Sequence, residues 1–223
     1  MGVHDGHRKR KRDQFLRCGA DSFADHELLE MLLYYALPQR NTNPIAHDLL
    51  DRFGNLQAVF AAPPEELMEV PYVKESAAAL IRLVPAIYQR ALLSEENNVV
   101  ILDTRERIGE YCCKMFIGHA TETMYQFCLD GKGKMKGCYK VSEGDLGSVG
   151  LNMRQIMENA LHSKALMVAL AHNHPSGVAL PSHEDQVATR MVQDALEAMG
   201  VHLVDHVIVA DNDYISMAES GFL

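Results

Sequence analysis

Residues 172–185 read H-N-H-P-S-G-V-A-L-P-S-H-E-D and join two kinds of secondary structure. The apolar run of residues 165–171 before them predicts a buried strand. Pro175 and Gly177 predict a turn that ends strand pairing. Ser182 stands at the N-cap position of a helix that should stop at Gly200. The residues that this helix is expected to bury are Val187, Met191, Val192, Ala195, Leu196 and Met199.

Two histidines and one aspartate in this stretch have the spacing of metal ligands. His172 and His174 are two residues apart at a strand end, so both side chains should project from one face. Asp185 lies in the first turn of the next helix, where its carboxylate can converge with the imidazoles. Two nitrogens and one oxygen suit Zn²⁺, and three protein ligands leave the open position of a catalytic site. The sequence therefore predicts one zinc ion per chain.

The spacing Ser182-x-x-Asp185 has a second interpretation as a capping box. The two interpretations are compatible, because a cap would orient the helix that carries the ligand.

The pattern H-x-H-P followed by S-x-x-D resembles the signature of the JAMM (JAB/MPN/Mov34) metalloproteases. The fuller run H-N-H-P-S-G with P-S-x-x-D, followed by L-V-D-H-V-I-V at residues 203–209, resembles the RadC branch. The resemblance implies that His172, His174 and Asp185 hold zinc, and that Ser182 hydrogen-bonds the water or the developing oxyanion. It also implies an upstream catalytic glutamate, matched here by Glu122 in E-T-M-Y-Q-F-C-L-D.

Two further residues near these motifs are open to interpretation. His206 could be another ligand, but a fourth protein ligand would close the open position, so a core or supporting histidine is favoured. Family members usually have Pro-Arg-Glu at a helix start where this chain has Met153, Arg154 and Gln155. Arg154 lacks its usual neighbour, and the sequence assigns it no role.

Composition limits the classes of function. The 223 residues are 48% hydrophobic and 23% charged, as in ordinary globular proteins, and no apolar run is long enough to span a membrane. An odd set of five cysteines without C-x-x-C spacing predicts reduced thiols in a cytoplasmic protein. The net charge of −9 argues against nucleic-acid binding by bulk electrostatics. The oligomeric state is not predicted.

A local basic cluster lies near the amino terminus. It consists of Arg8, Lys9, Arg10, Lys11 and Arg12, with Arg17 close by. It can be a phosphate-contacting arm that binds DNA weakly, or one solvated face of a terminal helix.

Residues 1–94 are expected to form a small all-helical domain. Asp25 should cap a helix ended by Pro38, and Thr42 should begin another that ends near Phe53 and Gly54. Residues 26–30, H-E-L-L-E, lack the second histidine of a zincin helix and are interpreted as a decoy. The short helices resemble the helix-hairpin-helix module of RadC-like chains. Its usual hairpin glycines are replaced by residues 71–74, P-Y-V-K, which makes DNA binding by this element doubtful.

A polar linker at residues 94–98 places the domain boundary, so residues 99–223 should form the zinc domain. Asp103 or Thr104 should cap a helix reaching about Phe116. Strands are expected at 122–129, 135–141, 201–209 and 214–217, with a hairpin turn at 130–133, a glycine-rich loop at 142–150 and a helix at 153–163. This order predicts an α/β domain with a mixed sheet flanked by helices. The resemblance to the JAMM proteins implies a fold related to that of the cytidine deaminases.

The favoured function is zinc-dependent hydrolysis of an amide or isopeptide bond in a protein or peptide. Zinc would lower the pKa of its bound water from about 15.7 to about 7. Glu122 would act as general base, and Ser182 would donate to the tetrahedral oxyanion. A nucleobase deaminase is disfavoured because H-x-E and P-C-x-x-C are absent. A DNA repair-associated binding protein and a metal-bound scaffold without catalysis remain as alternatives.

Overall fold

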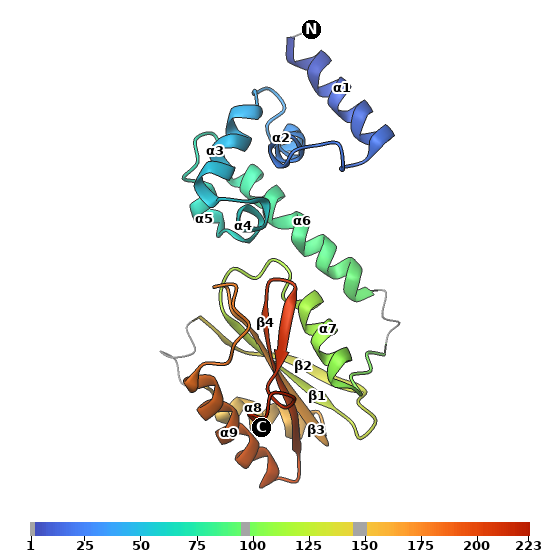
Figure 1. Cartoon of the computed structure of the whole chain (residues 1–223), viewed down its shortest axis with the longest axis vertical. Coiled ribbons are helices and arrows are strands. Elements are labelled where there is room, and N and C mark those ends of the chain that lie inside the picture. Colours follow the sequence, from blue (N-terminus) through green and yellow to red (C-terminus); the bar gives the residue numbers. More distant parts are fainter. Residues whose placement is uncertain (1–2, 95–98, 145–150) are drawn as a thin grey trace. The chain divides into compact units, whose positions relative to one another are not determined.

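The computed structural model describes residues 3–94, 99–144 and 151–223 (Figure 1). The chain divides into two compact units, Met1–Tyr88 and Gln89–Leu223. This division falls inside a helix, and residues 95–98 of the expected linker lie outside the described residues. Among the helices of the described ranges, none is both long and apolar enough to cross a membrane.

The first unit is all-helical, as predicted. Its helices are α1 (Val3–Cys18), α2 (Asp25–Ala36), α3 (Asn43–Phe53), α4 (Leu56–Ala61), α5 (Pro64–Leu67) and the first part of α6 (Glu75–Ser94). One apolar core joins α2 to α6, because each helix contributes a stripe of buried side chains at helical spacing. Its most buried members include Leu29, Leu33, Leu49, Leu67 and Ile81.

The helix starts of this unit follow the sequence signals with one correction. The expected cap at Asp25 is wrong by one residue, because Ala24 is the N-cap and Asp25 is the first helical residue. The Ala24 backbone N–H donates to Glu27 Oε2 at 3.0 Å, so a first-turn carboxylate satisfies the free donor instead. As predicted, α3 begins after Thr42 and stops at Phe53, before Gly54, whose φ of 91° is a glycine conformation.

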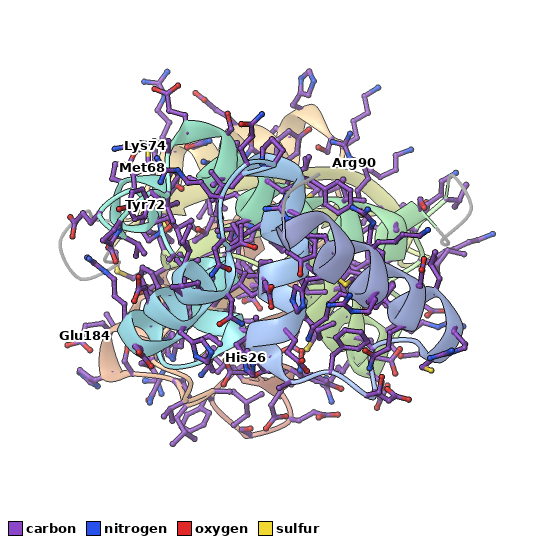
Figure 2. All side chains as sticks on the ribbon, turned by 90° about the horizontal axis from the view of Figure 1, so that it is seen from above. His26, Met68, Tyr72, Lys74, Arg90 and Glu184 are labelled. Atoms are coloured by element: carbon purple, nitrogen blue, oxygen red, sulfur yellow. The ribbon has the colours of Figure 1, made fainter. Side chains whose placement is uncertain are left out.

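The segment before α6 has a left-handed backbone at one residue although it contains no glycine. Tyr72 has a φ of 70°, a region that non-glycine residues adopt at a cost. The Arg40 guanidinium lies 4.2 Å from the centre of the Tyr72 ring, and this stacking helps to hold the residue there. Val73 is fully buried, while Tyr72 and Lys74 point outward (Figure 2).

The second unit contains the predicted mixed sheet. Its order is β2-β1-β3-β4-β5, with β3 and β4 parallel and the other neighbours antiparallel. The strands are β1 (Thr123–Leu129), β2 (Met135–Glu143), β3 (Met167–Asn173), β4 (His202–Ala210) and β5 (Asp213–Ser216). The buried strand was expected at residues 165–171. It starts two residues later and extends to Asn173, so that His172 belongs to its hydrogen-bonded ladder.

Helices cover both faces of this sheet (Figure 1). α7 (Arg105–Met115) packs on one face, and α8 (Met153–His162) and α9 (His183–Glu197) pack on the other. Ala169 and Ala171 face α7, whereas Val168 and Leu170 face α8 and α9, as the two-residue period of a strand requires. His172 therefore points to the face that α9 covers.

The other local predictions for this unit can be compared with the structure one by one. Thr104, not Asp103, caps α7, because its hydroxyl accepts from the Arg107 N–H. Asp130 forms the expected hairpin turn by accepting from the N–H groups of Lys132 and Lys134. Residues 145–150 of the expected glycine-rich loop lie outside the described residues. All five cysteines lie among the described residues, and each is a free thiol, as predicted.

The expected buried face of α9 is partly wrong. Val187 and Met191 are 45% and 56% exposed, whereas the buried positions are Asp185, Thr189, Val192 and Leu196. The reason is that polar side chains occupy the amino-terminal half of the inner face. A prediction based on apolar residues alone therefore places the buried face of α9 at the wrong positions.

Candidate metal centre

The topology brings three chain segments to one place in the second unit. β1 and β3 are antiparallel with Met124 opposite His172, so Glu122, just before β1, lies near the carboxyl end of β3. The turn after β3 then returns the chain to the amino terminus of α9, which carries Asp185. Ligand sites commonly form at the carboxyl end of a parallel strand followed by a helix.

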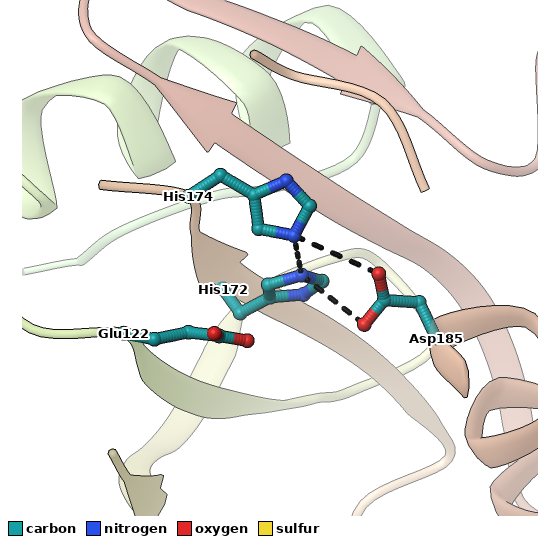
Figure 3. A group of neighbouring side chains, drawn as sticks. All are labelled: Glu122, His172, His174 and Asp185. Atoms are coloured by element: carbon teal, nitrogen blue, oxygen red, sulfur yellow. Dashed lines mark hydrogen bonds and ion pairs between the residues drawn. The ribbon is translucent and has the colours of Figure 1, made fainter. Parts of the chain in front are cut away.

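Four of the five site residues predicted from the sequence converge here (Figure 3). Glu122, His172, His174 and Asp185 each offer one ligand atom, and these atoms all lie within 4.8 Å of one another. The two histidine Nε2 atoms are 2.8 Å apart. Asp185 Oδ1 lies 3.4 Å from His172 Nε2, and Oδ2 lies 3.6 Å from His174 Nε2.

The orientation of His174 creates a position for a cation. His174 Nδ1 is 2.9 Å from the Val178 carbonyl oxygen. A carbonyl oxygen only accepts hydrogen bonds, so Nδ1 carries a proton and Nε2 is directed at His172. Two nitrogen lone pairs at 2.8 Å repel each other unless a proton or a metal ion lies between them.

The pKa shifts of these side chains agree with a cation, a proton or a metal ion, at that position. Interaction with Asp185 outweighs burial and raises the pKa of His174, so the metal-free centre can hold a proton at Nε2. Burial and the neighbouring His206 hold the pKa of His172 well below its ordinary value. Burial favours the neutral form of Asp185, but His174, His172 and Ser182 together lower its pKa, which keeps a carboxylate beside the cation position.

The donor set and its spacing fit zinc. Tetrahedral zinc with bonds of about 2.0–2.1 Å needs ligand atoms about 3.3 Å apart. The Asp185 oxygens already stand at 3.4 and 3.6 Å from the histidine nitrogens, and the nitrogens at 2.8 Å need only a small separation. His172 is fully buried, whereas the His174 side chain is 16% exposed, so the centre opens on the His174 side.

Ser182, the fifth predicted residue, holds the Asp185 carboxylate in place. Its hydroxyl donates to Asp185 Oδ2 at 2.6 Å, and its backbone N–H donates to the same oxygen at 2.8 Å. The Asp185 N–H in turn donates to Ser182 Oγ at 3.0 Å. This is the predicted capping box, and it orients the carboxylate toward the two histidines.

Asn173 is a positioning residue that the sequence reasoning missed. It lies between the two histidines but points to the α7 face of the sheet, where it is 6% exposed. Its Oδ1 accepts from the Thr123 N–H at 2.9 Å, and its Nδ2 donates to the Thr121 carbonyl at 3.1 Å. The amide therefore holds the backbone on both sides of Glu122. An asparagine on the opposite, buried face of the strand must have hydrogen-bond partners for its amide. This requirement was the signal in the sequence that could have identified Asn173.

His206 and Thr189 lie directly behind the predicted ligands. His206 is fully buried on β4, and its Nε2 is 2.8 Å from His172 Nδ1, as expected of a supporting histidine. Burial lowers the pKa of His206 to about 4, so its ring is neutral. Thr189 was not singled out from the sequence, yet its hydroxyl contacts His206 Nδ1 at 2.6 Å. An unexplained polar residue one turn after Asp185 on α9 was its only signal.

The basic cluster divides into structural and exposed residues. Arg8 is a correction to the expected phosphate-contacting set, because it is buried and its guanidinium donates to the carbonyls of residues 34, 37, 38 and 40. These carbonyls lie in the last turn of α2 and in the segment that follows it, where a cation is favourable. Lys11 pairs with Glu27. The exposed members are Lys9, Arg10 and Arg12, with Arg17.

Two other features have ordinary structural explanations. In the H-E-L-L-E segment, the His26 ring stacks on His47 at 4.4 Å and Glu30 accepts from Tyr34 at 2.9 Å, which agrees with its interpretation as a decoy. Arg154 is 85% exposed and pairs with Glu158 one turn along α8, an arrangement typical of a solvated helix face.

Comparison with known proteins extends over nearly the whole chain. Residues 101–222 match the model of the RadC-like JAB domain, and residues 6–79 match the UPF0758 N-terminal region. A UPF0758 protein of Rhodobacter capsulatus is 34% identical over 212 residues, covering 95% of this chain and 99% of the relative. A UPF0758 protein of Ruegeria pomeroyi is 32% identical over 217 residues, covering 97% of each chain.

Proposed function

This chain belongs to the UPF0758 family and carries a RadC-like JAB domain, and we propose that it is a zinc-dependent hydrolase of amide or isopeptide bonds in proteins or peptides. The observation that carries the proposal is the convergence of two imidazoles and two carboxylates within 4.8 Å. His172, His174 and Asp185 hold the metal in this proposal. A zinc ion bound there supplies Lewis acidity, which polarises a carbonyl and brings the pKa of water toward neutrality.

Glu122 is the proposed general base. Asn173 holds its backbone, and Figure 3 shows its carboxylate directed at the histidine pair from the side opposite Asp185. From that position it accepts the proton of the attacking water and passes it to the leaving amine. This division of labour needs one carboxylate that binds metal and one that moves protons.

Ser182 is the proposed donor to the tetrahedral oxyanion. Its single hydroxyl proton is donated in a hydrogen bond to Asp185 Oδ2, so donation to the substrate requires the hydroxyl to turn away. The Ser182 backbone N–H, 2.8 Å from the same oxygen, keeps Asp185 oriented when it does. A donor of this kind typically contributes about 2.7–4 kcal/mol to transition-state stabilisation.

Removal of the metal tests the proposal. Purified protein is expected to cleave members of a library of internally quenched peptides and lysine-linked isopeptides, to lose this activity on chelation, and to regain it with Zn²⁺. Cleavage that persists in fully chelated protein would refute a metal-dependent mechanism. Failure of zinc to bind at about one ion per chain would remove its basis.

Weak DNA binding is a second candidate function, favoured by four exposed basic residues on α1, namely Lys9, Arg10, Arg12 and Arg17. Because Arg8 and Lys11 have structural partners, at most four phosphate contacts come from this helix. The net charge of −9 opposes any broader electrostatic attraction.

We expect the affinity for a labelled duplex to be weak and to fall with salt on a log–log slope no steeper than about −4. Fluorescence anisotropy at several salt concentrations measures this slope. Replacing the four exposed residues with glutamine should abolish binding. The matched control replaces four exposed hairpin lysines, Lys132, Lys134, Lys136 and Lys140, with the same change in charge. A steeper slope, or equal loss in the control, would place binding elsewhere.

A further inference from the structure

A buried chain of hydrogen bonds connects two of the proposed metal ligands behind the centre. It runs from His172 through His206 and Thr189 to the backbone of Asp185. His172, His206 and Thr189 are all fully buried, and Asp185 is 5% exposed. A buried polar chain of this kind must be satisfied at every link, because water cannot replace a missing partner.

The directions of the two bonds made by the Thr189 hydroxyl follow from the last acceptor. Thr189 Oγ1 lies 2.5 Å from the Asp185 carbonyl oxygen, which can only accept, so the single Thr189 proton is donated there. The sulfur of Met217, at 3.7 Å from the same hydroxyl, is a far weaker acceptor. With its proton committed, Thr189 Oγ1 can only accept from His206 Nδ1 at 2.6 Å.

The hydrogen-bond directions extend from His206 to the proposed metal ligand His172. A neutral His206 that is protonated at Nδ1 has a lone pair at Nε2, and this nitrogen accepts from His172 Nδ1 at 2.8 Å. His172 therefore carries its proton on Nδ1 and presents Nε2 as a lone pair toward His174 and Asp185. The Val178 carbonyl imposes the same arrangement on His174 independently.

We propose that Thr189 and His206 are positioning residues that fix His172 in the tautomer whose Nε2 faces the metal. The inference rests on the proposed metal centre and assigns it a supporting chain that starts at a backbone carbonyl. The chain also links the two ligands mechanically, because the same carbonyl belongs to Asp185. Supporting partners of this kind change metal affinity by about 10- to 100-fold when they are removed.

Thr189→Val tests the chain with almost no change in shape. Without the hydroxyl, His206 Nδ1–H loses its acceptor, so the His206 proton moves to Nε2 and is donated to His172 Nδ1. His172 must then carry its own proton on Nε2, where it blocks the metal. We expect zinc affinity, measured by competition with a chelator of known affinity, to fall about 10- to 100-fold.

Two variants separate positioning from packing. Thr189→Ser keeps the hydroxyl and should retain wild-type affinity, although it removes a buried methyl group. His206→Gln can accept from His172 and donate to Thr189, and should bind zinc more tightly than His206→Leu. The visible spectrum of the Co²⁺-loaded protein reports the ligand set, and circular dichroism reports folding.

The imidazole tautomers give a readout that needs no metal. Long-range ¹H–¹⁵N NMR spectra should show Nδ1–H for His172 and His206 in the wild type, and Nε2–H for His206 in Thr189→Val. A wild type that binds no zinc would refute the proposed function, and the NMR spectra would still decide the tautomers. A wild type that binds zinc, with Thr189→Val equally tight or Thr189→Ser equally weakened, would refute the positioning chain.

Discussion

Replacing Glu122 with glutamine is expected to reduce hydrolysis by about 10²- to 10⁴-fold and to leave zinc content and folding unchanged. Glutamine keeps the size and polarity of the side chain but cannot take a proton from water. The carboxylate stands within 4.8 Å of the ligand atoms of His172, His174 and Asp185, close enough to act on a water molecule in the centre. Steady-state kinetics on the best peptide of the library, with elemental analysis of the same sample, measures both quantities.

Glu143→Gln provides a matched control for this experiment. Glu143 pairs with Thr123 in the β1–β2 ladder, and its exposed carboxylate contacts Lys140. Loss of that carboxylate should leave turnover unchanged. Loss of zinc in Glu122→Gln would make Glu122 a metal ligand, and full turnover would leave the mechanism without its base.

The centre was predictable where the residues form a contiguous pattern. The H-x-H spacing at a strand end and a capped helix start placed His172, His174 and Asp185 together, because strand and helix periods fix the directions of these side chains. Glu122 came only from the resemblance, since nothing local distinguishes a glutamate before a strand. Its position beside the histidines depends on the antiparallel register of β1 and β3, which no short window contains.

The supporting residues were harder to predict for the same reason. Asn173 and Thr189 act on residues that are distant in sequence, and their roles follow from burial and from hydrogen-bond direction. The misplaced inner face of α9 has this cause too. Asp185 and Thr189 replace apolar residues at its amino-terminal end, so apolar periodicity misplaced Val187 and Met191.

The fold was easier to predict from the sequence than these details of the site. Caps, glycine stops and the turn at Asp130 are local signals, and they located most helices and the hairpin. The burial of Arg8 could not be predicted from the sequence, because it depends on contacts with the end of α2, about thirty residues away in sequence. The basic cluster was therefore expected to be exposed as a whole, but only some of its residues are.

Zinc content of the His172→Ala/Asp185→Ala double variant tests the central claim most directly. The two substitutions remove one nitrogen and one oxygen ligand from the proposed set of three protein ligands. A control variant, His162→Ala/Asp194→Ala, makes the same chemical changes at exposed positions of α8 and α9. His174→Ala, at the more exposed ligand, serves as a second variant in case the double variant misfolds.

The measurement is the molar ratio of zinc to protein by elemental analysis, after dialysis against trace zinc. We predict about one zinc per chain in the wild type and in the control, and close to none in the double variant and in His174→Ala. Undiminished zinc in folded double variant, or equal loss in the control, would contradict the assignment of the centre to His172, His174 and Asp185.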